Sequence, residues 1–265
     1  MQWVAEVGGV TGRSLVYVGG LAEISAQALR LLVLSPLKRS RMLQRAIHEA
    51  MAIGVGAIPI VSLIAFFVGV IIALQGAYEL QRIGAMQLVA SLVAISITRE
   101  LGPLITAIVV IGRSGSAFAA EIGTMRVTEE LDALKTMALD PVAFLVVPKF
   151  LAMGVMLPCL AIWADLMGVL GGSLFGVAGG GFTFGGYMLA TRDALLLRDI
   201  TSGVVKSLVF GMVITAVGCH EGFATGSGAE EVGRSTTSAV VISILLVILI
   251  DLVFTALFYL ARGGN

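Results

Sequence analysis

Charged residues are scarce in this 265-residue chain: Asp, Glu, Lys and Arg make up 13% of it, whereas hydrophobic residues make up 58%. In soluble globular proteins about a quarter of the residues are charged, so lipid must surround most of this chain. The 17 basic and 17 acidic residues cancel, which leaves no overall charge to attract nucleic acid. The composition predicts an integral membrane protein with no nucleic-acid partner.

Residues typical of catalytic and metal sites are also scarce. The chain has two histidines, His48 and His220, and two cysteines, Cys159 and Cys219, each cysteine within an apolar run that suits a buried hydrophobe. It has neither a G-x-x-x-x-G-K-[ST] phosphate loop nor a G-x-S-x-G nucleophile elbow. We therefore expect a non-catalytic protein that holds no metal and no cofactor and cannot hydrolyse ATP by itself.

Long apolar runs predict the membrane spans. The run from Ala50 to Tyr78 is uncharged and exceeds the roughly 20 residues that cross about 30 Å of hydrocarbon. The basic cluster from Lys38 to His48 places the start of this span in the cytoplasm. Further spans are predicted at residues 86–112, from 142 toward 165, at 207–219 and at 235–261.

A glycine-rich stretch, residues 166–191, leaves the number of spans open. Its glycines recur every four residues, a spacing that lets another helix backbone approach closely: Gly168, Gly172, Gly176 and Gly180. The stretch either crosses as a separate span or extends the third span and then follows the far surface. The sequence thus predicts an all-α polytopic membrane protein with five or six spans, in a single domain of residues 1–265.

Two segments are predicted at the membrane surface. Residues 1–47 form an interfacial amphipathic region that precedes the transmembrane domain of residues 48–265; the alternative is a helix packed on a core. One side of this region is charged (Glu6, Arg13, Glu23, Arg30) and the other is apolar (Val4, Val7, Leu15, Val18, Leu21, Leu29, Leu32).

Residues 113–140 are too charged for lipid, yet Val127, Leu131, Leu134 and Ala138 form one apolar stripe. This predicts a short helix lying flat at the cytoplasmic surface.

Arg99 and Glu100 interrupt the second span. A charge near the bilayer centre costs on the order of 3 kcal/mol on insertion scales, so both residues need a partner or a wet cavity. As sequence neighbours they point about 100° apart on a helix, and each should find its partner elsewhere. Lys149 and Lys206 are the candidates. A buried ion pair that only fixes helix packing is the alternative to a transport role.

Two rows of small residues follow these ions, and each predicts close helix packing. The rows are Gly112, Ser116, Ala120 and Gly115, Ala119, Gly123. They fit either an interface between two copies of the chain or ordinary packing within one copy.

Several motifs in this region resemble the MlaE family of ABC transporter permeases. The residues that carry the resemblance are Arg99–Pro103, Gly112–Ala117, Ala120–Gly123, Met125–Arg126, Thr128–Leu131, Ala138–Pro141, Lys206–Gly211 and Gly233–Thr237. Nearly the whole chain is covered, and the N-terminal helix matches only loosely.

The resemblance implies a homodimeric permease of the bacterial inner membrane that moves phospholipid and maintains outer-membrane lipid asymmetry. Its implied partners are a cytoplasmic ABC ATPase that holds ATP and Mg²⁺, a periplasmic MCE-domain lipid-binding protein and a STAS-domain regulator. Arg99 and Glu100, with Ile97 and Leu101, would line the lipid cavity. A coupling helix at about residues 121–140 would contact the ATPase through Glu121, Arg126, Glu129, Glu130, Leu131, Asp132 and Leu134.

Two other classes compete with this interpretation. An ion-coupled secondary transporter of a hydrophobic or amphipathic substrate would use Arg99, Glu100 and glycine-broken helices at the midplane, but it gives the charged segment 121–140 no task. A membrane scaffold without transport activity leaves the two intramembrane charges without a function.

Overall fold

The computed structural model describes residues 16–31, 39–179 and 182–262, and every regular element within these ranges is helical. Five of the described helical segments are long and apolar enough to cross a membrane: Met42–Arg82, Met86–Val127, Val142–Ala178, Leu197–Ala224 and Ala229–Leu260. The prediction of an all-α polytopic membrane protein is confirmed, and the described part of the chain has five spans rather than six.

The spans are long helices with local changes in winding. The first is α2 (Arg39–Arg82), and the last two are α9 (Leu197–Ala224) and α10 (Ala229–Arg262). The second contains η2 (Met86–Leu88), α3 (Val89–Ser96), π-helical η3 (Ile97–Leu101), α4 (Gly102–Val110), π-helical η4 (Ile111–Gly115) and α5 (Ser116–Val127). The third joins π-helical η5 (Val142–Val146) to α7 (Val147–Ala178).

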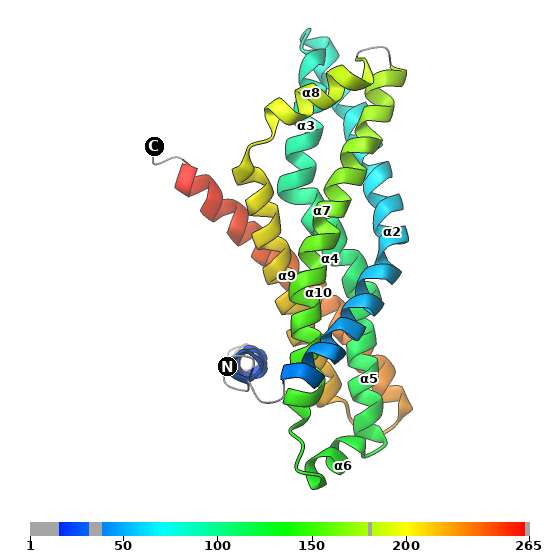
Figure 1. Ribbon diagram of the computed structural model, residues 1–265, viewed down its shortest axis with the longest axis vertical. Coiled ribbons are helices and arrows are strands. Elements are labelled where there is room, and N and C mark those ends of the chain that lie inside the picture. Colours follow the sequence, from blue (N-terminus) through cyan, green and yellow to red (C-terminus); the bar gives the residue numbers. More distant parts are fainter. Residues whose placement is uncertain (1–15, 32–38, 180–181, 263–265) are drawn as a thin grey trace, which may run out of the picture.

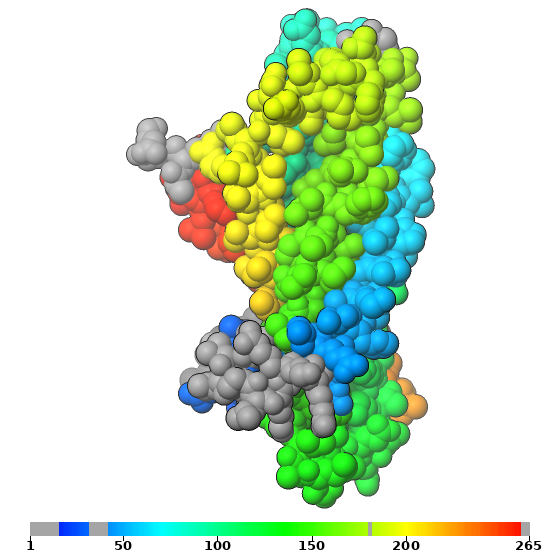
Figure 2. Space-filling view, viewed as in Figure 1, coloured from blue at the N-terminus to red at the C-terminus, as the bar shows by residue number. Residues whose placement is uncertain are grey.

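Two short helices mark the two ends of the bundle. Helix α6 (Glu130–Thr136) lies at the end where α2 begins, and α8 (Phe184–Ala194) lies across the opposite end (Figure 1). Because the basic cluster lies at the start of α2, the α6 end is cytoplasmic. Figure 2 shows that the C-terminal part of α10 projects from the body beside α9.

Helix α8 explains why the glycine-rich stretch adds no span. Helix α7 ends at Ala178, where three consecutive glycines, residues 179–181, disfavour further helix. The chain then turns, and the hydroxyl oxygen of Thr183 caps α8 by accepting the backbone N–H of Gly186 at 3.2 Å. Tyr187 anchors α8 by burying its ring completely, and this burial raises the pKa of its hydroxyl to about 12. Of the two alternatives, the extended third span is therefore correct.

The glycines of α7 allow close contact with α2, as predicted. A Cβ at Gly69 would collide with the carbonyl of Gly168, and one at Gly171 would collide with the carbonyl of Phe66. Further along α7, Gly172 and Gly176 leave room for Tyr187. Gly180 lies outside the described residues. The ridge is thus used for packing within one chain.

One of the two small-residue rows on the second span is also used within the chain. A Cβ at Gly218 of α9 would lie 2.8 Å from the carbonyl oxygen of Gly115, and one at Gly222 would lie 3.1 Å from that of Ala119. The row Gly115, Ala119, Gly123 therefore packs against α9, which is the second of the two alternatives, packing within one copy. By contrast, a Cβ at Gly112 would meet no other atom within 4 Å, so this row faces outward.

The N-terminal helix, residues 16–31 of the described chain, packs against the cytoplasmic end of the bundle. Its inner face contributes Leu21, Ile24, Ala28 and Leu31 to a hydrophobic cluster. Val18 and Leu29, which were predicted to share the apolar side with Leu21, are instead exposed. The helix therefore buries one face in protein and leaves apolar side chains for the membrane. Glu6, Arg13 and the apolar residues Val4, Val7, Leu15 and Leu32 lie outside the described residues.

Candidate functional site

A π-helical segment places Arg99 and Glu100 in the middle of the second span. The segment, η3, runs from Ile97 to Leu101 and is followed directly by Gly102 and Pro103. A π-helix inserts an extra residue into the turn and changes the directions in which side chains point, and such segments are frequent at functional sites. Here the two charged side chains find different partners on other helices.

Arg99 forms an ion pair with Asp199 at the start of α9. Its Nη2 lies 2.6 Å from Oδ1 of Asp199, and its Nε donates to the same oxygen at 2.7 Å. The other carboxylate oxygen accepts the backbone N–H of Leu196 at 3.2 Å and so caps α9. Because only 2% of the Asp199 side chain is exposed, the pair neutralises a charge that would be costly to bury alone.

Glu100 belongs to a second cluster, centred on Lys206 of α9. The Lys206 ammonium is fully buried and lies 2.5 Å from Glu100 Oε2 and 2.9 Å from Asp251 Oδ1 of α10. It also donates to the hydroxyl of Thr255 at 2.9 Å. Two carboxylates therefore share one ammonium, and the cluster joins three spans. The prediction that Lys206 partners an intramembrane ion is confirmed.

The two clusters border a groove of about 370 Å³ between α9 and α10. Its polar lining is Arg99, Glu100, Arg198, Asp199, Thr201, Ser202 and Thr255, and its apolar lining is Val205, Phe258 and Tyr259. Charges gathered beside aromatic and aliphatic side chains suit an amphipathic molecule. A groove bordered by Arg99 and Glu100 agrees with the predicted position of a substrate cavity, while its role in transport stays a prediction.

Two of the predicted cavity residues point elsewhere. Ile97 is buried in a cluster with Ala73, Val89 and Val93, because it packs toward α7 rather than toward the groove. Leu101 is half-buried and does not line the groove either. Ile97 lies two residues from Arg99, which is about 200° around an α-helix, so its side chain points away from the groove.

Sequence reasoning missed two acidic residues of the site, Asp199 and Asp251. Asp251 is the sole charged residue in the apolar run 235–261, and the cost of an intramembrane charge could have identified it. Asp199 lies at the edge of an apolar run, where charged residues are common, so its position alone does not indicate a functional site.

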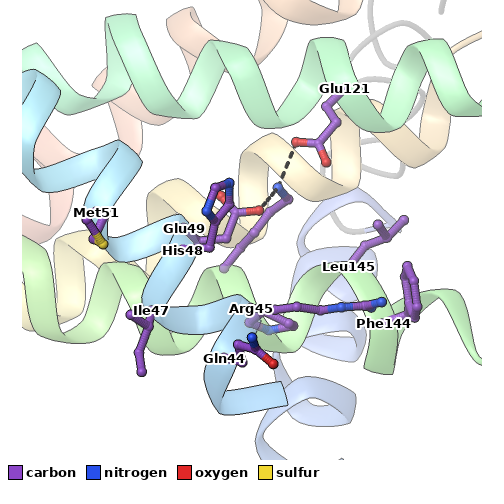
Figure 3. Close-up of a pocket in the computed structure, with 11 residues that line it drawn as sticks. Gln44, Arg45, Ile47, His48, Glu49, Met51, Glu121, Phe144 and Leu145 are labelled. Atoms are coloured by element: carbon purple, nitrogen blue, oxygen red, sulfur yellow. Dashed lines mark hydrogen bonds and ion pairs between the residues drawn. The ribbon is translucent and has the colours of Figure 1, made fainter. Parts of the chain in front are cut away.

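Lys149 proves to pair away from the groove. Its ammonium lies 2.7 Å from Glu49 of α2 and 2.7 Å from Glu121 of α5, so it does not contact Arg99 or Glu100 (Figure 3). The reason is its position near the cytoplasmic start of α7, far along the bundle from η3. The two lysines predicted as alternatives thus serve separate sites.

The predicted coupling region is a helix–turn–helix rather than one flat helix. Helix α5 ends at Val127, Glu129 adopts a left-handed backbone with φ 62°, and α6 follows. Leu131 is buried and Leu134 packs beside it in the protein's own hydrophobic cluster, so their apolar stripe faces inward. The surface open to a partner includes the exposed residues Glu129, Glu130, Asp132, Lys135 and Met137.

Contacts within the protein hold this region in place. The Arg126 guanidinium donates to the backbone carbonyl of Phe223 at the end of α9. Lys135 donates to Asp132 at 2.8 Å, and this hydrogen bond holds the pKa of that carboxyl below its ordinary value. The Arg126 contact ties the end of α5 to the end of α9, whose other end carries Asp199.

Comparison with known proteins agrees with the architecture. Residues 46–257 match the family model described as "Permease MlaE". A Rickettsia conorii protein named "Probable ABC transporter permease protein" is 39% identical over 242 residues, which cover 91% of this chain and 92% of that protein. The Haemophilus influenzae "Intermembrane phospholipid transport system permease protein MlaE" is 34% identical over 80% of this chain and 82% of its own length.

A plant protein is also similar. The Arabidopsis thaliana "Protein TRIGALACTOSYLDIACYLGLYCEROL 1, chloroplastic" is 38% identical over 75% of this chain and 57% of its own length. The family match reaches into all five spans and includes both charged clusters. The chain is a multi-pass membrane protein that belongs to the MlaE permease family.

Proposed function

We propose that the protein is the permease subunit of an ATP-driven transporter that moves phospholipid between the inner membrane and an MCE-domain lipid carrier. The single observation that carries the proposal is the groove between α9 and α10, where the Arg99–Asp199 and Glu100–Lys206–Asp251 clusters meet Val205, Phe258 and Tyr259. Membership of a permease family supports it, as does the phospholipid transport named for the H. influenzae relative.

The groove suits a phospholipid because its polar and apolar sides are adjacent. A guanidinium such as that of Arg99 donates paired hydrogen bonds to phosphate and stays charged when partly desolvated. Its pairing with Asp199 keeps the empty groove close to neutral, which limits the cost of holding charges within the membrane. Acyl chains would lie along Val205 and Phe258.

ATP hydrolysis belongs to a separate cytoplasmic ATPase in this proposal, and that partner would hold ATP and Mg²⁺. The exposed acidic residues Glu129, Glu130 and Asp132 form the surface that we assign to it. Because Leu131 is buried in the protein's own core, α6 is packed against the rest of the protein. A push on α6 can then reach the bundle through Arg126 and α9.

A second copy of the chain and a STAS-domain regulator complete the proposed assembly. The outward row Gly112, Ser116, Ala120 is the small-residue surface that remains available for a second copy. Maintenance of outer-membrane lipid asymmetry would be the physiological role of the complete transporter.

Reconstitution with the ATPase tests the proposal. The protein and ATPase would be placed in liposomes with fluorescent phospholipid, and transfer between the liposomes and a soluble MCE-domain protein would be followed. We expect transfer that requires hydrolysable ATP and persists when ion gradients are dissipated. Transfer that follows an ion gradient and ignores ATP would instead favour the secondary-transporter alternative.

A further inference from the structure

A second cavity, separate from the groove, lies at the cytoplasmic end of the bundle. Its volume is about 740 Å³, and it is bordered by the start of α2, the middle of α5 and the start of η5 and α7 (Figure 3). None of its lining residues borders the groove at Arg99. Of its lining residues, only Glu121 belongs to the predicted coupling region.

One wall of this cavity is acidic. The Lys149 ammonium donates a hydrogen bond to one carboxylate oxygen of Glu49 and to one of Glu121, at 2.7 Å in both cases. Because two carboxylates share one ammonium, the triad keeps a net negative charge. Each carboxylate has a second oxygen that accepts no hydrogen bond from the described residues, and 48% of the Glu121 side chain is exposed. This wall can bind a small cation that carries N–H donors.

The other wall is basic. The Arg45 guanidinium stacks on the ring of Phe144, with 3.5 Å between its central carbon and the ring centroid. Stacking leaves the N–H donors at the edge of the guanidinium available, and within the described ranges no carboxylate pairs with it. His48 lies one helical turn further along α2 and also lines the cavity. This wall can bind an anion such as a phosphate.

An apolar row connects the cavity with the membrane. Ile47 and Met51 line the cavity, Val55 follows at the same four-residue spacing on α2, and all three are exposed. Residues four apart lie above one another on a helix, so the row is continuous. It runs from the charged walls into the uncharged part of the first span, where acyl chains would lie.

We propose that this cavity binds a phospholipid of the cytoplasmic leaflet whose headgroup carries both a phosphate and a primary ammonium, as in phosphatidylethanolamine. The phosphate contacts Arg45 and His48, the ammonium contacts Glu49 and Glu121, and the acyl chains follow Ile47, Met51 and Val55. Charge complementarity on both walls selects this headgroup over one with phosphate alone. The bound lipid joins α2 to α5, which leads into the coupling region.

Photocrosslinking from the apolar row reports lipid at this cavity independently of the groove at Arg99. A Met51→benzoylphenylalanine variant, purified and placed in nanodiscs, would be irradiated with one labelled lipid at a time. Phosphatidylethanolamine should crosslink several-fold more than phosphatidylglycerol, which lacks the amine, or phosphatidylcholine, whose quaternary amine has no N–H. Equal yields for the three lipids would overturn the proposal without changing any protein residue, and displacement by inorganic phosphate would show a free-anion site instead.

Charge-neutralising substitutions separate the two walls. Arg45→Gln should reduce crosslinking of phosphatidylethanolamine and phosphatidylglycerol alike by about tenfold, the typical effect of losing one charge-assisted contact. Glu121→Gln should reduce phosphatidylethanolamine alone and bring it to the level of phosphatidylglycerol. Arg192→Gln, an exposed change on α8, is the matched control. If Arg45→Gln keeps the unmodified crosslinking yield and Glu121→Gln keeps the unmodified lipid preference, the site assignment is wrong.

The lipid readout is independent of transport. Loss of lipid preference at Met51 with ATP-driven transfer intact would contradict this site and leave the proposed function standing. Preserved lipid preference at Met51 without ATP-driven transfer would support this site and contradict the proposed function. Thermal unfolding would show whether Arg45→Gln alters folding. In that case Arg45→Lys, which keeps the positive charge, is the variant to compare, and it should retain part of the lipid binding.

Discussion

Arg99 and Asp199 are 100 residues apart in sequence, yet their side chains meet at 2.6 Å and tie the π-helical middle of the second span to the first turn of α9. This pair sets the wall of the groove and also caps α9, because the second oxygen of Asp199 accepts the N–H of Leu196. Its disruption should therefore affect both the groove and the stability of the bundle.

Asp199→Ala should destabilise the protein by about 3–5 kcal/mol, the usual effect of leaving one member of a buried ion pair alone. The partly exposed position of Arg99 places the expected value at the lower end of this range. A double-mutant cycle with Arg99→Ala, followed by chemical or thermal unfolding in detergent, measures the coupling. Additive effects of the two substitutions would show that the pair contributes no stability.

Lys206→Met should be more harmful than removal of either acid, because it leaves Glu100 and Asp251 without their shared cation. The triple variant Lys206→Met, Glu100→Gln, Asp251→Asn removes every charge of the cluster and should recover much of the lost stability. Thermal unfolding and purification yield would be compared for the single and triple variants. A triple variant no more stable than Lys206→Met would mean that charge balance is not what holds these three helices together.

The combined change Glu130→Lys and Asp132→Lys should release the ATPase, since it reverses the charge of the exposed face of α6. Co-purification of the two proteins and lipid-stimulated ATP hydrolysis would both be measured. Glu79→Lys, an exposed reversal near the far end of α2, is the control and should retain the ATPase. Unchanged co-purification in the double variant would place the docking surface elsewhere.

Gly115→Leu and Gly112→Leu should separate packing within one copy from packing between copies. A larger side chain at Gly115 would press on Ile214 of α9, so this variant should unfold at a lower temperature. Gly112 has open space around it, so the second variant should fold normally and lose cross-linking between copies in native membranes. If Gly112→Leu keeps full cross-linking, the dimer contact does not use this row.

The approximate positions of the spans could be predicted because uncharged runs and flanking basic residues act locally, but the helices extend beyond those runs, as in Leu197–Ala224. Lys206 could be named as a candidate ion partner, but its pairing with Glu100 and that of Arg99 with Asp199 could not be assigned, since they join residues 106 and 100 positions apart. Periodicity did identify the apolar stripe of α6, but it could not show whether Leu131 faces a partner or the protein's own core. Ile97 lies about 200° from Arg99 around an α-helix, so helix geometry could have separated the two residues from the sequence alone.

The groove between α9 and α10 is the centre of this account, and lipid crosslinking from its aromatic wall tests it most directly. Benzoylphenylalanine in place of Phe258 would be irradiated in inner membranes, with and without Arg99→Ala, and phospholipid transfer would be measured in parallel. We predict a phospholipid adduct at position 258, and a fall of roughly tenfold to a hundredfold in adduct and transfer with Arg99→Ala, which corresponds to about 1.5–3 kcal/mol. No adduct at position 258, together with unchanged transfer by Arg99→Ala, would contradict it and leave the charged clusters as structural ion pairs.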